Sequence, residues 1–396
     1  MPSTAATRDE DLAVAMDAIA ELAADIGARR PTGPGEAAAA EALVKRLRSA
    51  GVDADMEEFG GYSTFGAPFG IVLGLAVLPA LLPRRRRLPR LLASSLAVAG
   101  LVTEGSLRFA PLSALLARRP SRNVVATIEP RGLAERTLCL VAHMDTSRSG
   151  LIFHPRVVRW MPRWIAASSI LVLLQGALEP LSARRLFRRA LGLVRGALAA
   201  SLGLLAEREG LGVDVPGAND NASGCGVVAA LAARLAAEPL ESTRVEILIT
   251  GCEEAGTLGA QAYRDSRGVE GRMFLNFDNV GGPGTVRFLR REGVIAKWDA
   301  DEGLIAAAQG VADRRPDLRI APEDDPAGLT YDTSPIHAVG GRALTISVQD
   351  GFIPSLHWPT DTVANVDRDG VRRTLEAGAE LVGAIDRGEA DGVRGG

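Results

Sequence analysis

The stretch PGANDNASGCGVVAALAARLAAEPLESTRVEILITGCEE, residues 216–254, decides the fold class. Small and polar residues lead into a helical pattern over 222–236, and the apolar, β-branched run at 243–250 is typical of a buried strand. The same alternation continues with strands at 273–278 and 342–348 and with helices near 257–264, 301–313 and 368–386. Strands separated by helices predict a three-layer α/β/α sandwich with a mixed, mostly parallel central sheet.

The chain before residue 216 adds to this sheet but is interrupted twice. Helices are expected at about 9–28 and 35–50, and strands at 52–58, 123–128 and 137–142. Two apolar blocks separate these segments. We therefore expect one discontinuous catalytic domain, made of residues 1–60, 120–150 and 213–396, with helical insertions at 61–119 and 151–212.

Composition narrows the class of partner. The net charge of the 396 residues is -3, so no global basic field favours nucleic acid. The three cysteines, Cys139, Cys225 and Cys252, are too few for a disulfide framework. We expect them to be small buried packing residues rather than thiolate metal ligands, because free cysteine is among the most buried residue types.

Each apolar block is predicted to form a helical hairpin with an arginine-rich tip, at Arg84–Arg87 and at 184–189. Only 64–83 has about the 20 uncharged residues that span a bilayer, and the run at 190–206 is interrupted by Arg195. These features favour membrane association through re-entrant or interfacial helices. The alternative is a cytoplasmic protein whose apolar helices pack on themselves or form a dimer interface.

Acidic and histidine residues stand beside the expected strands and helices of the catalytic domain, in a fixed order along the chain. Each one alone has an ordinary explanation as a helix cap, a turn residue or a solvated loop. Together they supply enough carboxylate and imidazole for two metal ions, which makes a metal-dependent hydrolase the first hypothesis. They are His143, Asp145, Asp220, Glu253, Glu254, Asp278 and His357.

The spacing assigns different tasks within this set. His143 and Asp145 are two residues apart at a strand end, so one can bind metal while the other orients it. Adjacent side chains diverge, so one carboxylate of the Glu253-Glu254 pair can bind metal while the other takes a proton from water. Asp220 precedes a helix, where its two oxygens could bridge two cations.

Six ordered elements carry a resemblance to a known family. They are Arg122-Asn123-Val124-Val125-Ala126, His143-x-Asp145, Asp220-Asn221-Ala222-Ser223-Gly224, Glu253-Glu254 with Gly259-Ala260, Asn276-x-Asp278-x-x-Gly281, and His357-x-x-Thr360-Asp361. In these elements the chain resembles metallopeptidase family 28, the co-catalytic di-zinc aminopeptidases and their carboxypeptidase relatives. The resemblance covers about 1–60, 120–150 and 213–390.

The resemblance implies two zinc ions and an exopeptidase, aminopeptidase-like, that hydrolyses peptide bonds with a metal-bridged water. One zinc would take His143 and Asp278, the other Glu254 and His357, and Asp220 would bridge them. Glu253 would be the general base, and Asp145 would orient His143. The family also implies a cis peptide bond after Asp145.

Three departures from the family pattern bear on substrate and rate. The second apolar block fills the gap between His143 and Asp220, where the family has a short loop. Tyr331-Asp332-Thr333-Ser334-Pro335-Ile336 replaces Ser-Asp-His-x-Pro-Phe, and Leu356 replaces a tyrosine that often precedes the last ligand. Leu356 removes one donor to the transition-state oxyanion.

Two other classes of function remain as alternatives. A catalytically inactive, membrane-tethered binding protein could use the same fold, although all five ligands are present. A transporter or channel built from the apolar blocks has little support, because the blocks hold few internal ionisable residues. The substrate is expected to be a peptide, and its side-chain preference and the oligomeric state are left open.

Overall fold

The computed structural model describes residues 5–324 and 328–392, and the side chains from residue 9 onward within them. A mixed nine-stranded sheet lies at its centre, in the order β1-β2-β4-β3-β5-β9-β6-β7, with β8 paired to β6. The strands are β1 (Ala54–Gly61), β2 (Arg119–Ile128), β3 (Arg136–His143), β4 (Thr243–Thr250), β5 (Arg272–Phe277), β6 (Val286–Glu292), β7 (Trp298–Asp299), β8 (Ile320–Asp324) and β9 (Arg342–Val348).

The four central strands β4, β3, β5 and β9 run parallel, and antiparallel pairs extend the sheet at both edges. The expected α/β fold with a mixed sheet is therefore confirmed. The sequence did not predict β6, β7 and β8. The first carries three arginines, the second has two residues, and the third contains a proline and acidic residues, so none has the apolar run of a buried strand.

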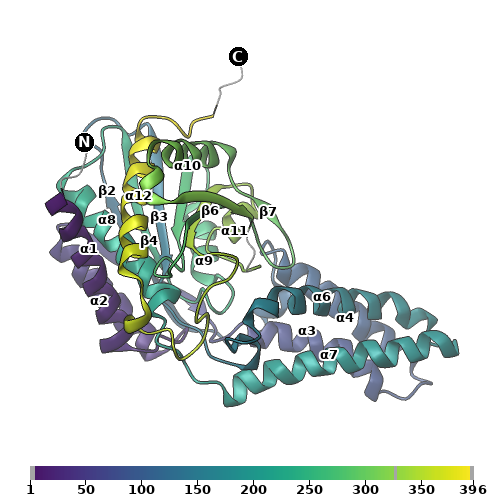
Figure 1. The fold of residues 1–396 in the computed structure, drawn as a ribbon. Coiled ribbons are helices and arrows are strands. Elements are labelled where there is room, and N and C mark those ends of the chain that lie inside the picture. Colours follow the sequence, from purple (N-terminus) through teal and green to yellow (C-terminus); the bar gives the residue numbers. More distant parts are fainter. Residues whose placement is uncertain (1–4, 325–327, 393–396) are drawn as a thin grey trace.

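Helices cover both faces of the sheet (Figure 1). One layer holds α1 (Ala5–Ala20, extended by a π-helical turn over Glu21–Ile26), α2 (Pro34–Ser49), α8 (Ser223–Ala237), α10 (Glu302–Arg314) and α12 (Arg368–Asp386). The other holds α9 (Leu258–Arg267) and α11 (Ser334–His337). Along β3, Leu138 and Leu140 pack into the first layer while Cys139 and Val141 pack into the second, as the two-residue period of a strand requires. The three cysteines are buried and unpaired, as expected.

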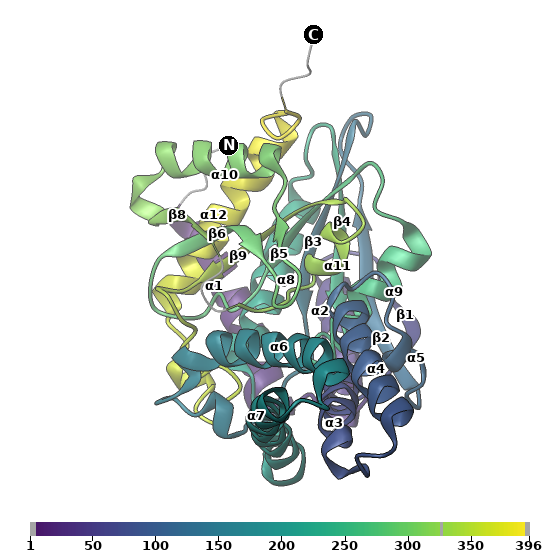
Figure 2. The ribbon, with the colours of Figure 1, turned by 90° about the vertical axis from the view of Figure 1, so that its right-hand side faces the viewer.

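The two apolar blocks form the helical hairpins that the sequence predicts, and the hairpins pack together as one four-helix bundle. The first contributes α3 (Gly66–Leu81), α4 (Arg87–Gly105) and the short α5 (Pro111–Ala114), and the second contributes α6 (Met161–Leu178) and α7 (Arg185–Leu211). In the bundle, α3 and α6 each contact both α4 and α7. The bundle projects from one end of the α/β body (Figure 1), and its end faces the viewer in Figure 2.

The expectation that 64–83 is the segment long enough to span a bilayer is wrong. The helix there has 16 residues, or about 24 Å, because the chain leaves the helix after Leu81. The two helical segments that are long and apolar enough by length and composition are Val158–Leu181, with 24 residues, and Arg185–Leu211, with 27. The second continues through Arg195, whose side chain is buried inside the bundle.

Candidate metal centre

The five ligands inferred from the sequence meet at one edge of the sheet. His143 ends β3, the pair Glu253 and Glu254 follows β4, and Asp278 follows β5 directly. Carboxyl ends of neighbouring parallel strands meet at the same edge, which is where α/β proteins bind ligands. Asp220 reaches this edge from the turn before α8, and His357 from the loop after β9. All five side chains are buried.

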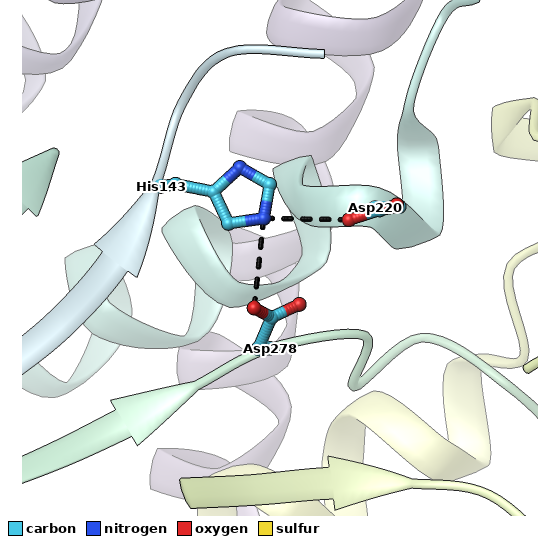
Figure 3. A group of neighbouring side chains, drawn as sticks. All are labelled: His143, Asp220 and Asp278. Atoms are coloured by element: carbon cyan, nitrogen blue, oxygen red, sulfur yellow. Dashed lines mark ion pairs between the residues drawn. The ribbon is translucent and has the colours of Figure 1, made fainter. Parts of the chain in front are cut away.

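Two groups of three side chains share Asp220. In the first, His143 Nε2 lies 3.3 Å from Asp220 Oδ1 and 3.6 Å from Asp278 Oδ2 (Figure 3). In the second, His357 Nε2 lies 3.0 Å from Glu254 Oε1 and 3.1 Å from Asp220 Oδ2. Within each group the ligand atoms all lie within 4.8 Å of one another. Each oxygen of Asp220 thus faces a different histidine, which is the arrangement a bridging carboxylate needs.

Glu253 lies beside the first group without being part of either. Its Oε2 is 3.9 Å from His143 Nε2, and the side chain lines the cavity above the site. Burial, with the charge of Glu254 added, raises the pKa of Glu253 well above its usual value, against the opposing charge of His143. A carboxyl with a raised pKa can take up a proton at neutral pH and release it again.

The electrostatics of the centre favour bound cations. Burial raises the pKa of Asp278, and the charge of Asp220 raises it further, while His143 opposes both. Burial alone would lower the pKa of His357, but Glu254 and Asp220 outweigh it and raise that pKa to about 9. Buried carboxylates outnumber the imidazoles here, and a buried excess of negative charge is stable only when it is paired or binds metal.

Asp145 does not hold His143 in the way the sequence suggested. His143 Nδ1 lies 3.1 Å from the backbone carbonyl oxygen of Asp145, and 3.8 Å from its carboxylate Oδ1. The carboxylate instead accepts hydrogen bonds from the backbone N–H groups of Glu253 and Glu254, at 2.9 and 3.0 Å. Asp145 therefore orients the histidine through its main chain and the glutamate pair through its side chain. The cis peptide bond also lies elsewhere, between Asp220 and Asn221 rather than after Asp145.

A cavity of roughly 300 Å³ opens onto the centre. The wall on the side of the α/β body carries His143, Asp220, Glu253, Glu254, Asp278 and His357. The opposite wall is formed by side chains of α3, α4, α6 and α7. The buried ring of Tyr331 lines it as well. Leu356, which stands where the family often has a tyrosine, packs in an apolar cluster with Phe153 and Val158 from the second insertion. The insertions thus shape the space directly over the candidate metal centre.

Residues 202–382 match the model of peptidase family M28. This part of the chain is therefore similar to that family. The match contains Asp220, Glu253, Glu254, Asp278 and His357, and it begins within α7, so that it leaves out His143 and Asp145. No curated protein matches the chain.

Solved structures of low sequence identity share the fold of this chain. A zinc aminopeptidase from Bacillus subtilis has a TM-score of 0.56 at 14% identity, over 94% of each chain. An aminopeptidase from Aneurinibacillus sp. strain AM-1 has a TM-score of 0.57 at 14% identity, over 95% of this chain and 94% of the other. A glutaminyl cyclase from Porphyromonas gingivalis has a TM-score of 0.52 at 16% identity, over 95% and 97%. At these identities the likeness shows the fold alone.

Several buried residues that hold the loops of the candidate metal centre were not assigned from the sequence. Asp361 accepts hydrogen bonds from the backbone N–H groups of Asn219 and Asp220, at 2.7 and 3.0 Å. Asn279 donates to Asp278 at 2.7 Å and to Asp220 at 3.4 Å. The sequence signal for Asp361 was its place in the motif His357-x-x-Thr360-Asp361. Asn279 was visible only as the residue after a ligand.

Two further charged side chains reach the centre from the N-terminal part of the chain, Arg29 from the loop before α2 and Glu36 from α2 itself. Arg29 is fully buried and donates to five backbone carbonyls, including those of Met144 and Gly217, next to the loops that carry His143 and Asp220. Glu36 accepts from the backbone N–H of Cys252, just before the glutamate pair. The carbonyls of Met144 and Gly217 and the N–H of Cys252 lie more than a hundred residues away in the sequence, so no local pattern could have identified these contacts.

Proposed function

We propose that the chain is a zinc-dependent metallopeptidase, an aminopeptidase-like exopeptidase that holds two metal ions. The observation that carries the proposal is the position of Asp220, which belongs to two complete groups of three ligands at once. Each group offers one imidazole nitrogen and two carboxylate oxygens, a donor set that suits Zn²⁺ and leaves coordination positions open for substrate. The M28 match and the zinc aminopeptidases that share the fold support the choice of metal.

His143 and Asp278 would hold one ion, Glu254 and His357 the other, and Asp220 both. When bound, zinc supplies a Lewis acid that polarises the scissile carbonyl and lowers the pKa of water. Glu253 stands within reach of the same space and would take the proton of the attacking water, then pass it to the leaving nitrogen. Asp145 fixes the main chain of Glu253 and Glu254, so the base and its neighbouring ligand keep a constant separation.

Replacing Glu253 tests the base without removing a ligand. The Glu253→Gln variant is expected to retain the zinc content of the wild type and to lose turnover by about 10²–10⁴-fold, the usual contribution of a positioned base. Glu238→Gln, at an exposed position of the same body, is the matched control and should change neither quantity. A Glu253→Gln protein with its full zinc content and wild-type hydrolysis would overturn the assignment.

The same assays separate the alternatives. A catalytically inactive binding protein would show no turnover on aminoacyl or dipeptidyl substrates even with two zinc ions per chain. Because a glutaminyl cyclase shares the fold, peptides with an N-terminal glutamine belong in the screen, with ring closure measured beside hydrolysis. Cyclisation without hydrolysis would replace the peptidase proposal.

We also infer that the four-helix bundle associates with a lipid bilayer. Along α7 the seventeen residues 190–206 carry one charge, the buried Arg195, and span about 26 Å, close to the thickness of a hydrocarbon core of about 30 Å. The exposed arginines Arg84–Arg87 and Arg185 lie beyond one end of this band, where lipid headgroups would meet them. Flotation of the purified chain with anionic vesicles tests the inference. A chain that stays with the soluble fraction as a dimer would contradict it.

A further inference from the structure

The cavity above the candidate metal centre continues deep into the bundle. Among the residues that line it, Val172 lies eleven residues into α6 from the body, and Ser201 lies ten residues from the body end of α7. At 1.5 Å per residue these positions are about 15 Å inside the bundle. The reacting centre and the interior of the bundle are therefore joined by one continuous space.

The walls of this inner part are apolar. Phe69, Val72 and Leu73 face it from α3, Leu101 from α4, and Leu205 from α7. The serine hydroxyls there already have partners within the bundle, since Ser168 and Ser201 bond to each other at 3.0 Å. Toward the body, the carboxylate of Glu104 is engaged by the backbone of Leu112 and by Ser113.

An extended peptide does not suit this space. Every peptide unit brings one N–H and one C=O, and burying them without partners costs free energy. A long alkyl chain carries no polar group and gains from burial along its whole length. The occupant that fits the inner cavity is therefore an unbranched hydrocarbon chain whose reactive end lies at the ligand cluster.

We propose that the substrate is an amide of a long-chain fatty acid, with its acyl chain in the bundle and its amine or amino-acid part on the solvent side. This inference rests on the proposed hydrolytic function and specifies its substrate class. The oxygen of water bonds to the acyl carbon and the carbon–nitrogen bond breaks. One water proton passes through Glu253 to the leaving nitrogen. The products are a fatty acid, which ionises, and a free amine.

A chain-length series tests the substrate class on the zinc-loaded full-length protein. N-acetyl-, N-octanoyl- and N-dodecanoylglycine are compared with an aminoacyl anilide as a short reference substrate. The kcat/KM should rise by up to about fourfold for each methylene that enters the cavity, and then level off once the cavity is full. Hydrolysis of the reference substrate with no gain from longer chains would overturn this inference and leave the peptidase proposal standing. Loss of all hydrolysis, reference included, would instead count against the proposed function.

A pair of substitutions on one helix locates the chain. Val72→Phe fills the inner cavity, and the matched Leu78→Phe lies on the outer surface of the same helix α3. Val72→Phe should lower the ratio of dodecanoyl to acetyl kcat/KM by tenfold or more, while Leu78→Phe leaves that ratio unchanged. Leu73→Ala enlarges the cavity and should shift the preferred acyl chain to a greater length. This variant still tests the assignment if the Val72→Phe protein fails to fold. Equal ratios in all three variants would contradict the assignment.

A binding measurement separates the acyl site from the chemistry. Dodecanoate, the product of the longest substrate, should bind the zinc-free wild type at one site per chain in calorimetry, whereas acetate should not bind. Val72→Phe should weaken this binding by tenfold or more, and Leu78→Phe should not. Equal binding to both variants would show that dodecanoate adheres to the outside of the bundle, and the inference would fail whatever the enzyme hydrolyses.

Discussion

The α/β body and the four-helix bundle are built for different surroundings. The body buries its aliphatic side chains on both faces of the sheet and confines its buried carboxylate cluster to one edge. In the described residues, nineteen of the twenty-three exposed large apolar side chains lie in the two insertions, 61–119 and 151–212. The bundle meanwhile hides Arg90, Glu179 and Arg195 in its interior. One chain thus combines a body with a buried apolar core and a bundle that exposes many of its large apolar side chains.

The largest expected effect is at the residue on which both ligand groups of the body depend. Asp220→Ala removes one ligand from each group, so both metal ions should be lost and hydrolysis should fall by at least the 10²–10⁴-fold expected for losing the base alone. Zinc content and turnover of the purified variant are the measurements. Vesicle binding through the bundle should not change, which would confirm that the two regions work independently. Retention of one zinc would show that one group suffices by itself.

The second effect breaks the interior of the bundle. Glu179 pairs with Arg90 at 2.9 Å and also with Arg195, and all three side chains are largely buried. Glu179→Gln leaves two buried guanidinium groups without a counter-charge, so the free energy of unfolding should fall by about 3–5 kcal/mol. Replacement of all three by methionine should restore most of that loss, because well-packed apolar groups often substitute for buried ions. A Glu179→Gln protein as stable as the wild type would mean that water reaches the arginines.

The third effect concerns the exposed apolar surface of the bundle. Leu193 on α7 is 79% exposed, and Leu133 in a loop of the body is 89% exposed. If the bundle enters a bilayer, Leu193→Gln should reduce vesicle partitioning by about tenfold or more, since burying one leucine contributes about 1.5–3 kcal/mol. Leu133→Gln should leave partitioning unchanged. If Leu193→Gln instead dissociates a dimer, the apolar face is a contact between copies of the chain.

The two regions also differ in how far the sequence could predict them. Three of the five ligand residues, His143, Glu254 and Asp278, could be predicted because they lie at or just after the ends of apolar strands, and parallel strands bring such ends to one edge. Asp220 and His357 were found from the motifs before a helix and in a loop. Which atom of Asp145 faces His143 depends on the path of the loop, and no residue pattern encodes that path. Arg29 bonds to carbonyls of distant segments, so its role needs the assembled fold. In the bundle, the sequence predicted the apolar helices but not their lengths. The uncharged run 64–83 forms a helix of only 16 residues, Gly66–Leu81.

The last effect, which is the smallest per pH unit, is a pH dependence of the stability of the body. Burial raises the pKa of Asp361 to about 7, against the hydrogen bonds from Asn219 and Asp220. Because the folded chain binds this proton more tightly than the unfolded chain, the contribution of Asp361 to stability is fully present below about pH 4 and is lost as the pH rises through about 7. The slope from one such group is at most about 1.4 kcal/mol per pH unit. Denaturant unfolding of the zinc-free wild type and of Asp361→Asn across this range measures it. The two curves should converge in slope above about pH 7, and parallel curves between about pH 4 and pH 7 would show that Asp361 stays ionised in the folded body.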